Sequence, residues 1–110
     1  MLLDERGGPN HVGNFCYAPV HADTKTGALT YMNSFYYIGH FSKFIRPGAQ
    51  RVAATTNDDK LQSVAFKNPD GKLAVVVLNV QDEEIPFKLW IDGQVAKTTS
   101  PAHSIITVVY

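Results

Sequence analysis

The sequence contains a single cysteine and a single tryptophan, and neither sign of charge predominates. Because Cys16 is alone, a disulfide within the chain is excluded and cysteine usage does not indicate a redox compartment. Lys and Arg together number 10, as do Asp and Glu. This balance argues against nucleic acid or an anionic membrane as a partner, since both attract basic surfaces. No apolar run approaches the roughly 20 residues of a membrane-spanning helix.

The length and apolar content favour one ordinary globular domain. The chain has 110 residues, of which 45% are hydrophobic and 18% charged, so a disordered chain is not expected. Residues 1–5 have neither a basic start nor a long apolar stretch, so we expect no signal peptide there. The sequence leaves the compartment unknown.

A short amphipathic helix is predicted at about residues 34–45, with Asn33 or Ser34 as its N-cap. Apolar residues recur at spacings of three and four, which places them on one helix face. These are Phe35, Ile38, Phe41, Phe44 and Ile45. Pro47 excludes the helical conformation for Arg46 and so ends the helix. The helix joins an irregular N-terminal stretch to a series of short strands.

Strands separated by turn signals dominate residues 48–110. Asn68-Pro69-Asp70-Gly71 and Asp92-Gly93 are strong hairpin turns. The apolar run 73–78 predicts a strand buried on both faces, and Pro86 favours an edge position for the strand 85–91. We therefore predict an antiparallel, Greek-key-like β-sandwich, with a barrel as the other arrangement of such strands. The predicted strands are 50–55, 61–67, 72–79, 85–91, 95–98 and 104–110, after a short hairpin at 18–23 and 29–32.

No catalytic or metal site is predicted from the residues themselves. Nearly all acidic residues fall in turns, which they stabilise or where they are solvated. The four histidines lie far apart in the sequence, so no metal site is expected, and we interpret His40 as a packed or hydrogen-bonded residue. There is no glycine-rich phosphate loop and no serine elbow, so no cofactor is expected. Cys16 is interpreted as a structural or free thiol.

Trp90 falls on the polar face of its predicted strand. An exposed Trp at such a position is either a platform for a sugar ring or a residue that a neighbouring domain covers. The residues favour the second interpretation without excluding the first.

Three stretches resemble glycoside hydrolase family 30, the glucosylceramidase family. The run 4–10 (DERGGPN), followed by Val12, Asn14 and Phe15, resembles the last loop of its barrel. The run 37–45 (YIGHFSKFI) resembles the final barrel helix. The third resemblance is to its C-terminal β-sandwich and rests on residues 68–71, 75–79 and 100–105.

The resemblance implies a retaining β-glycosidase built from a (β/α)₈ barrel and a side sandwich, with a role in carbohydrate and sphingolipid metabolism. In this family two glutamates held roughly 5 Å apart carry out hydrolysis, and both lie on barrel strands upstream of the segment represented here. The resemblance therefore implies a remnant of the last barrel unit over 1–47, the sandwich over 48–110, no catalytic residue, and no activity of this chain alone.

By the same resemblance, Asn14 and Phe15 match the loop at the sugar or aglycone entrance and are the candidate substrate contacts. His11 and Tyr17 stand where the glucosylceramidases usually have Trp and Asp, so the lining of this entrance departs from the family pattern. The implied partner is the missing barrel portion, with a β-glycoside substrate only in the full enzyme. The alternative is a stand-alone carbohydrate-binding or structural accessory module.

The missing barrel has a physical consequence for the predicted helix. In the family the final helix packs on the barrel, and strands from the N-terminal end of the chain complete the sandwich. Without them, the face formed by Phe35, Phe41 and Phe44 lacks its partner. We expect the helix to dock on the chain's own sandwich, or the chain to self-associate through this face or an open sheet edge.

Overall fold

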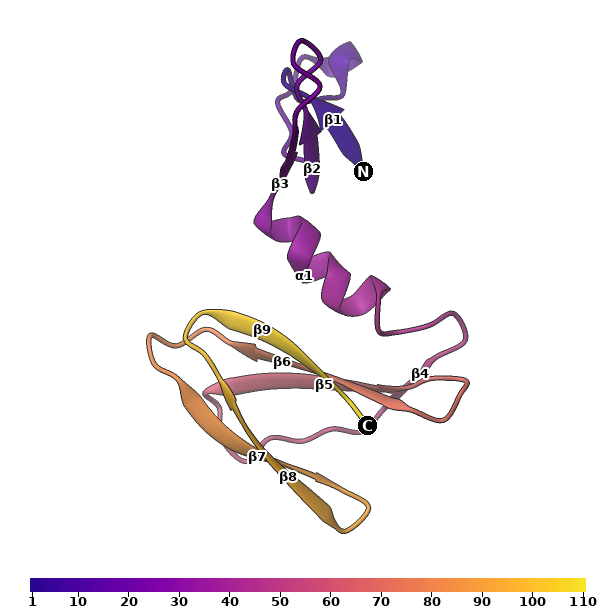
Figure 1. The fold of residues 1–110 in the computed structure, drawn as a ribbon, viewed down its shortest axis with the longest axis vertical. Coiled ribbons are helices and arrows are strands. Elements are labelled where there is room, and N and C mark those ends of the chain that lie inside the picture. The colour runs from indigo at the N-terminus through magenta and orange to yellow at the C-terminus, as the bar shows by residue number, and fades with distance from the viewer. The chain divides into compact units, whose positions relative to one another are not determined.

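The computed structural model describes the backbone of residues 1–110 and all side chains except that of Asn10. The chain divides into two compact units, Met1–Gly39 and His40–Tyr110. Figure 1 shows the elements of both units along the chain. Strands account for most of the regular structure and one α-helix accompanies them.

The first unit contains a small three-stranded sheet. Its strands are β1 (Leu2–Asp4), β2 (Val20–Ala22) and β3 (Leu29–Tyr31), in the order β1-β2-β3. The antiparallel pairing of β2 and β3 confirms the predicted hairpin. Strand β1 pairs with β2 in parallel, which the sequence did not predict. A 3₁₀-helix, η1 (Asn10–Val12), interrupts the stretch predicted to be a loop.

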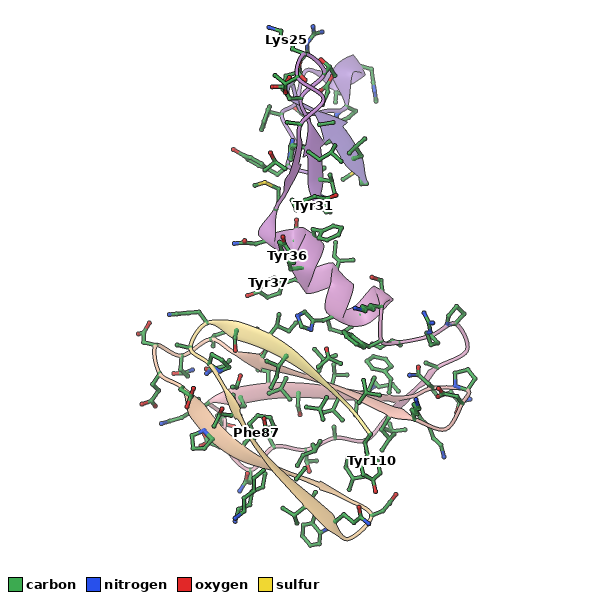
Figure 2. The ribbon with its side chains drawn as sticks, viewed as in Figure 1. Lys25, Tyr31, Tyr36, Tyr37, Phe87 and Tyr110 are labelled. Atoms are coloured by element: carbon green, nitrogen blue, oxygen red, sulfur yellow. The ribbon has the colours of Figure 1, made fainter. Side chains whose placement is uncertain are left out.

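Helix α1 covers Asn33–Ser42 and ends before the predicted position near residue 45. The N–H of Ile45 still donates to the carbonyl of Phe41 at 2.9 Å, so a further turn follows the helix. No residue of the helix is buried: the side chains of Phe35 and Phe41 remain 40% and 41% exposed. Figure 2 shows Tyr36 and Tyr37 extending outward from the helix. Phe44, just beyond it, is half-buried.

The second unit is a β-sandwich, as predicted. One sheet has four strands in the order β4-β5-β6-β9, and β7 and β8 form a separate two-stranded sheet. Every pairing in both sheets is antiparallel. The strands are β4 (Gln50–Val52), β5 (Leu61–Lys67), β6 (Leu73–Asn79), β7 (Ile85–Ile91), β8 (Gln94–Ser100) and β9 (Ser104–Val109).

Two predicted strand lengths were wrong, because pairing rather than local propensity decides where these strands end. Strand β4 was predicted to reach residue 55, but its pairing stops where Val52 meets Ala65. Strand β8 was predicted to cover only 95–98. It runs from Gln94 to Ser100 because β7 pairs with it along its whole length.

The core lies between the two sheets and centres on β6. Ala74, Val75, Val76 and Val77 are all at most 4% exposed, which confirms a strand buried on both faces. Residues on the inner faces of both sheets form the main apolar cluster, because side chains alternate between the two faces of a strand. Its buried members are Leu61, Ala65, Val75, Val77 and Ile85, with Val52, Phe87, Leu89 and Ile106 packed against them.

Candidate functional site

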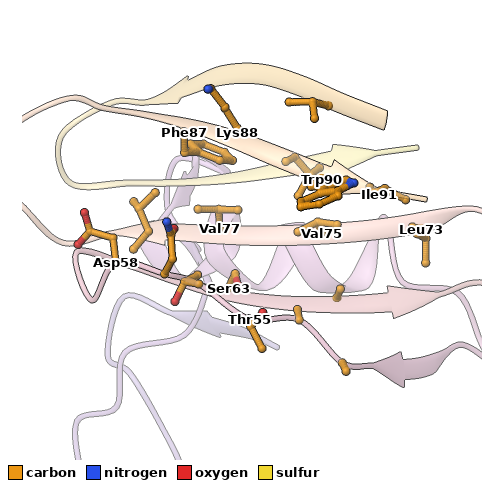
Figure 3. Close-up of a pocket in the computed structure, with 18 of the residues that line it drawn as sticks. Thr55, Asp58, Ser63, Leu73, Val75, Val77, Phe87, Lys88, Trp90 and Ile91 are labelled. Atoms are coloured by element: carbon orange, nitrogen blue, oxygen red, sulfur yellow. The ribbon is translucent and has the colours of Figure 1, made fainter. Parts of the chain in front are cut away.

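An open cleft of about 1030 Å³ lies within the second unit, between the inner faces of the two sheets. Val75 and Val77 of β6 line one side, and Phe87 of β7 lines the other. Figure 3 shows the two valines on the side of their strand that faces Phe87. Protein interiors are close-packed, with few voids larger than a water molecule. The lining combines core-facing residues with exposed ones such as Lys88 and Trp90, so the space between the two sheets opens to solvent.

The unpaired edge of β7 borders this cleft. Strand β7 pairs only with β8, yet every residue from Ile85 to Asp92 lines the cleft. Residues of both strand faces can share one cleft only if the backbone edge between them faces it. This edge position confirms the prediction made from Pro86.

The turn between β7 and β8 fixes which backbone groups of β7 are free. Asp92 and Gly93 have φ values of 48° and 81°, which identifies a two-residue type I′ turn. Ile91 and Gln94, which flank this turn, therefore form a hydrogen-bonded pair, and such pairs recur at every second residue. Consequently Pro86, Lys88 and Trp90 direct their backbone groups away from β8. Proline suits such an edge because it has no backbone N–H and no neighbouring strand there needs one as a donor.

Trp90 lies on the outer face of the β7–β8 sheet, 76% exposed. Its cross-strand partner is Val95, which is 55% exposed. The position on the wet face of the strand is as predicted. The described residues leave the Trp ring uncovered, so it is available to a ligand or to a further polypeptide segment.

Asn14 and Phe15, the predicted substrate contacts, lie in the first unit and are both exposed. The Phe15 ring meets the Tyr17 ring edge-on, with centroids 5.1 Å apart. Gly7, which has φ +66°, approaches the Phe15 ring so closely that a Cβ there would lie 2.8 Å from Phe15 Cδ2. The predicted loop therefore packs against a glycine of the preceding turn, while Phe15 remains 57% exposed.

The glutamates of the described chain are engaged in structural roles or lie on the surface. The N–H of Thr24 donates to Glu5 Oε2 at 3.0 Å, and the Thr24 hydroxyl donates to Oε1 at 2.8 Å. The first of these bonds is the main cause that lowers the pKa of Glu5, so this carboxylate holds its charge. Glu83 pairs with Lys60 at 2.9 Å and thereby raises the pKa of that lysine.

Three of the four histidines, His21, His40 and His103, make hydrogen bonds within the chain. Nδ1 of His40 lies 2.9 Å from Oγ1 of Thr107, which confirms the interpretation of His40 as a hydrogen-bonded residue. His21 Nε2 accepts a bond from the N–H of Ala18 at 3.0 Å, and His103 pairs with Asp82 at 2.8 Å. Among the described side chains, no group of three or more His, Cys, Asp or Glu residues could hold a metal ion. Cys16 is free and half-buried.

The sequence did not predict the cleft and the free β7 edge. Pro86 was a signal for the edge, but the unfilled space depends on how many strands each sheet collects. That number is set by pairing between distant residues. No membrane-spanning candidate occurs among the described helices, which lack the necessary length and apolarity.

Known protein families match both parts of this architecture. The family model described as "Glycosyl hydrolase family 30 beta sandwich domain" matches residues 48–108, and that of the family 30 TIM-barrel domain matches residues 1–45. Mouse lysosomal acid glucosylceramidase is 40% identical over 112 residues, and the alignment covers the whole chain and 22% of the mouse enzyme. Putative glucosylceramidase 2 of Caenorhabditis elegans is 37% identical over 100 residues, which are 89% of the chain and 19% of that protein.

Solved structures agree in fold. SrfJ from Salmonella typhimurium superposes with a TM-score of 0.93 at 36% identity, covering 99% of this chain and 24% of SrfJ. The endo-β1,6-glucanase BT3312 superposes with a TM-score of 0.85 at 26% identity, covering 96% of this chain and 24% of the glucanase. The chain thus spans about a quarter or less of these relatives. Its two matched segments, its sandwich and its relatives show that the chain belongs to glycoside hydrolase family 30.

Proposed function

We propose that this chain is the C-terminal part of a glucosylceramidase-like retaining β-glycosidase and does not hydrolyse glycosides by itself. The observation that carries the proposal is the unfilled cleft of the sandwich, bordered by the free edge of β7. A core left open to this extent is expected of a part that completes its packing with further polypeptide. The boundary that we propose lies between residues 47 and 48.

The positions of the carboxylates support the proposed lack of activity. A retaining glycosidase needs two carboxyl groups about 5 Å apart, one of them able to donate a proton near neutral pH. The lowered pKa of Glu5 makes it a poor proton donor, and Glu83 is tied to Lys60 at the surface. In the family the catalytic glutamates belong to barrel strands that precede the matched segment.

The missing barrel portion is the partner that we propose for this chain. Its contribution to the sandwich would be an extended strand at the edge of β7, where the N–H groups of Lys88 and Trp90 lack a strand partner. Because side chains alternate along a strand, every second residue of the added strand would enter the apolar cleft beside Phe87 and Leu89.

A chimeric enzyme tests this proposal. The C-terminal segment of mouse glucosylceramidase that aligns with this chain is replaced by residues 1–110, and hydrolysis of a fluorogenic β-glucoside is measured. We expect the chimera to release the fluorophore and the 110-residue chain alone to give only the buffer rate. A Leu89→Asp chimera should lose activity because it places a charge in the cleft, while Lys67→Asp, an exposed position, should retain it. Hydrolysis by the chain alone would contradict the proposal.

Asn14 and Phe15 are the substrate contacts that we propose within the assembled enzyme. Both are exposed, and the packing of Phe15 against Gly7 supports a fixed position for its ring. In the chimera, Phe15→Ala should raise KM for the β-glucoside more than it lowers kcat. Tyr110→Ala, at an exposed residue of the sandwich, is the matched control.

Self-association is proposed for the chain without its partner, through the helix face of Phe35, Phe41 and Phe44 or through an open sheet edge. The exposure of Phe35 and Phe41 supports the first route, and the unpaired edge of β7 supports the second. Light scattering after size exclusion, with the parent compared to Phe35→Ser/Phe41→Ser, measures the mass. A parent chain that stays monomeric at all concentrations would refute this proposal.

The exposure of Trp90 favours a second candidate function, a stand-alone carbohydrate-binding module. A flat aromatic ring that is 76% exposed offers an apolar face to the C–H groups of a sugar. Neutral β-glucosides titrated against ¹⁵N-labelled chain should then shift the Trp90 indole signal. If this signal does not move, Trp90 is not a sugar platform for neutral glucosides.

A further inference from the structure

Two lysines face each other on the outer surface of the β7–β8 sheet. Lys88 of β7 is the direct cross-strand partner of Lys97 of β8, and both are exposed. The type I′ turn at Asp92-Gly93 places this pair among the non-hydrogen-bonded pairs, in which opposite Cα atoms are only about 4.5 Å apart and side chains come closest. Like charges in this position repel each other.

No acidic side chain of the described residues neutralises these lysines. Among the described side chains, Glu83 pairs with Lys60 and Asp82 lies 2.8 Å from His103, and no carboxylate pairs with Lys88 or Lys97. The chain as a whole is neutral, with ten basic and ten acidic residues, so this pair is not part of a generally basic chain. The uncompensated pair on β7 and β8 is therefore a local concentration of positive charge.

The next cross-strand pair on the same face is Trp90 and Val95. Residues two apart on a strand lie about 6.8 Å apart, since each residue advances roughly 3.4 Å. The Trp ring, 76% exposed, and the Val side chain, 55% exposed, thus form an apolar pair that follows the lysine pair along the same two strands. This spacing is comparable to the size of a single pyranose ring with one charged substituent.

We propose that the outer face of β7–β8 binds an acidic saccharide, with a sugar ring on Trp90 and its carboxylate between Lys88 and Lys97. This proposal rests on the carbohydrate-binding candidate function and adds the charge class of the ligand. The anion relieves the repulsion between the lysines, and the apolar face of the sugar covers the Trp ring. Lys88, Trp90 and Val95 also line the cleft at the free edge of β7, whereas Lys97 does not.

An anionic membrane surface fits this face less well. Membrane binding at an interface improves with buried apolar area and with several basic residues. Here the apolar area is one Trp and one Val, and the turn that follows Trp90 carries the acidic residue Asp92. The limited platform and the acid at its end favour a soluble saccharide over a lipid surface.

Trp90 also provides the measurement, because it is the only tryptophan of the chain and its fluorescence reports on this face alone. The probes are cellotetraose and the β-1,4-linked tetraglucuronate, which share rings and linkage and differ in the carboxylates. We expect tetraglucuronate to change the emission at about tenfold lower concentration than cellotetraose. The reason is the attraction between its carboxylate and the ammonium groups of Lys88 and Lys97. Salt that screens these charges should remove the difference.

The variant Lys88→Gln/Lys97→Gln should bind the two saccharides equally. The matched control Lys67→Gln/Lys72→Gln removes the same charge from exposed lysines at another hairpin and should keep the preference for tetraglucuronate. Trp90→Ala, followed by NMR amide shifts, should lose binding of both saccharides while the spectrum of the sandwich persists.

The other outcomes overturn the proposal in distinguishable ways. Equal effects of the two saccharides on the parent chain would retain the Trp90 platform and refute the role of the lysines. No effect of either would refute both the acidic ligand and the sugar platform. A shift of Trp90 emission with phosphatidylserine vesicles, but not with tetraglucuronate, would identify a membrane-docking face instead.

Discussion

Nδ1 of His40 lies 2.9 Å from the Oγ1 of Thr107, so a hydrogen bond ties the C-terminal part of α1 to the outer face of β9. This contact places the end of the helix on the four-stranded sheet. It also gives a physical role to the histidine of the Gly-His-Phe-Ser-Lys-Phe stretch that carries the resemblance to family 30. The second unit starts at this residue.

Replacing His40 by Ala should lower the free energy of unfolding by about 1 kcal/mol, the usual net value of one part-buried hydrogen bond. Chemical denaturation measures the change. Thr107→Val removes the same bond from the other side, and the double variant should cost less than the sum of the two. Strict additivity of the two single effects would show that the contact contributes no stability.

Asn79 is fully buried at the end of β6 and fastens the loops at that end of the sandwich. Its Nδ2 lies 2.9 Å, 3.0 Å and 2.9 Å from the carbonyl oxygens of Glu83, Ser100 and Pro101, and its Oδ1 accepts from the N–H of Gln81. Asn79→Ala removes four hydrogen bonds from the part-buried and buried groups of this end of the sandwich and should cost about 2 to 4 kcal/mol of unfolding free energy.

The control for Asn79 is Asn57→Ala, at an exposed turn position, which should change stability by less than about 0.5 kcal/mol. Where Asn79→Ala proves too unstable for equilibrium denaturation, hydrogen exchange of the parent chain offers a second measurement. The N–H of Gln81 should then be among the slowly exchanging loop amides. A rapidly exchanging Gln81 amide would contradict this role of Asn79.

Acid should loosen the first unit through Glu5. Because hydrogen bonds from Thr24 lower the pKa of Glu5 in the folded chain, their stabilisation is present above the ordinary carboxylate pKa of about 4.3. It is lost as the pH falls through the lower pKa of the folded state. Amide exchange of Thr24, followed through an acid titration, should accelerate in that range.

The variant Glu5→Gln keeps an acceptor oxygen but cannot titrate, so exchange at Thr24 should lose this acid step. Glu84→Gln, which removes an exposed carboxylate from the second unit, should leave the step in place. A Thr24 amide that responds to acid equally in the parent and in Glu5→Gln would exclude Glu5 as the titrating group.

Gly7→Ala tests the packing that holds the loop of Asn14 and Phe15. The added Cβ would lie 2.8 Å from the Phe15 ring at a residue with φ +66°, so both strain and steric overlap are expected. Gly13→Ala is a matched control, because Gly13 has φ +64° and nothing within 4 Å of the added atom. The control should cost about 1 kcal/mol from backbone strain.

Gly7→Ala should cost at least about 1 kcal/mol more than the control, since the Phe15 ring must move or the turn must shift. Thermal unfolding gives the difference, and the ring signals of Phe15 and Tyr17 in NMR spectra report the displacement. Equal stability of the two variants, with unchanged ring signals, would show that Gly7 does not position Phe15.

The regular strands of the sandwich were predictable because their signals are local. Alternating Ile85, Phe87, Leu89 and Ile91 defined β7 to the residue, and the Asp92-Gly93 turn defined its end. The apolar run of β6 indicated burial on both faces. The parallel pairing of β1 with β2 could not be predicted, since it joins residues almost twenty positions apart without a local signal.

Some features of the candidate sites also followed from local sequence signals, and others did not. The exposure of Trp90 followed from the alternation of its strand, and the hydrogen bond of His40 was expected in kind although its partner Thr107 was not. The opposition of Lys88 and Lys97 depends on the β7–β8 register, and the cleft depends on only two strands joining that sheet. Neither arrangement can be recognised in any one stretch of sequence.

The sequence by itself determined the strands, the turns, the helix and the resemblance to family 30, because apolar periodicity and turn residues act over a few neighbouring positions. Only the tertiary structure decided which strands share a sheet, which edge stays free and which charges face each other. These features arise from pairing between distant segments, where hydrogen bonds and packing across the sandwich outweigh the local preferences of each residue.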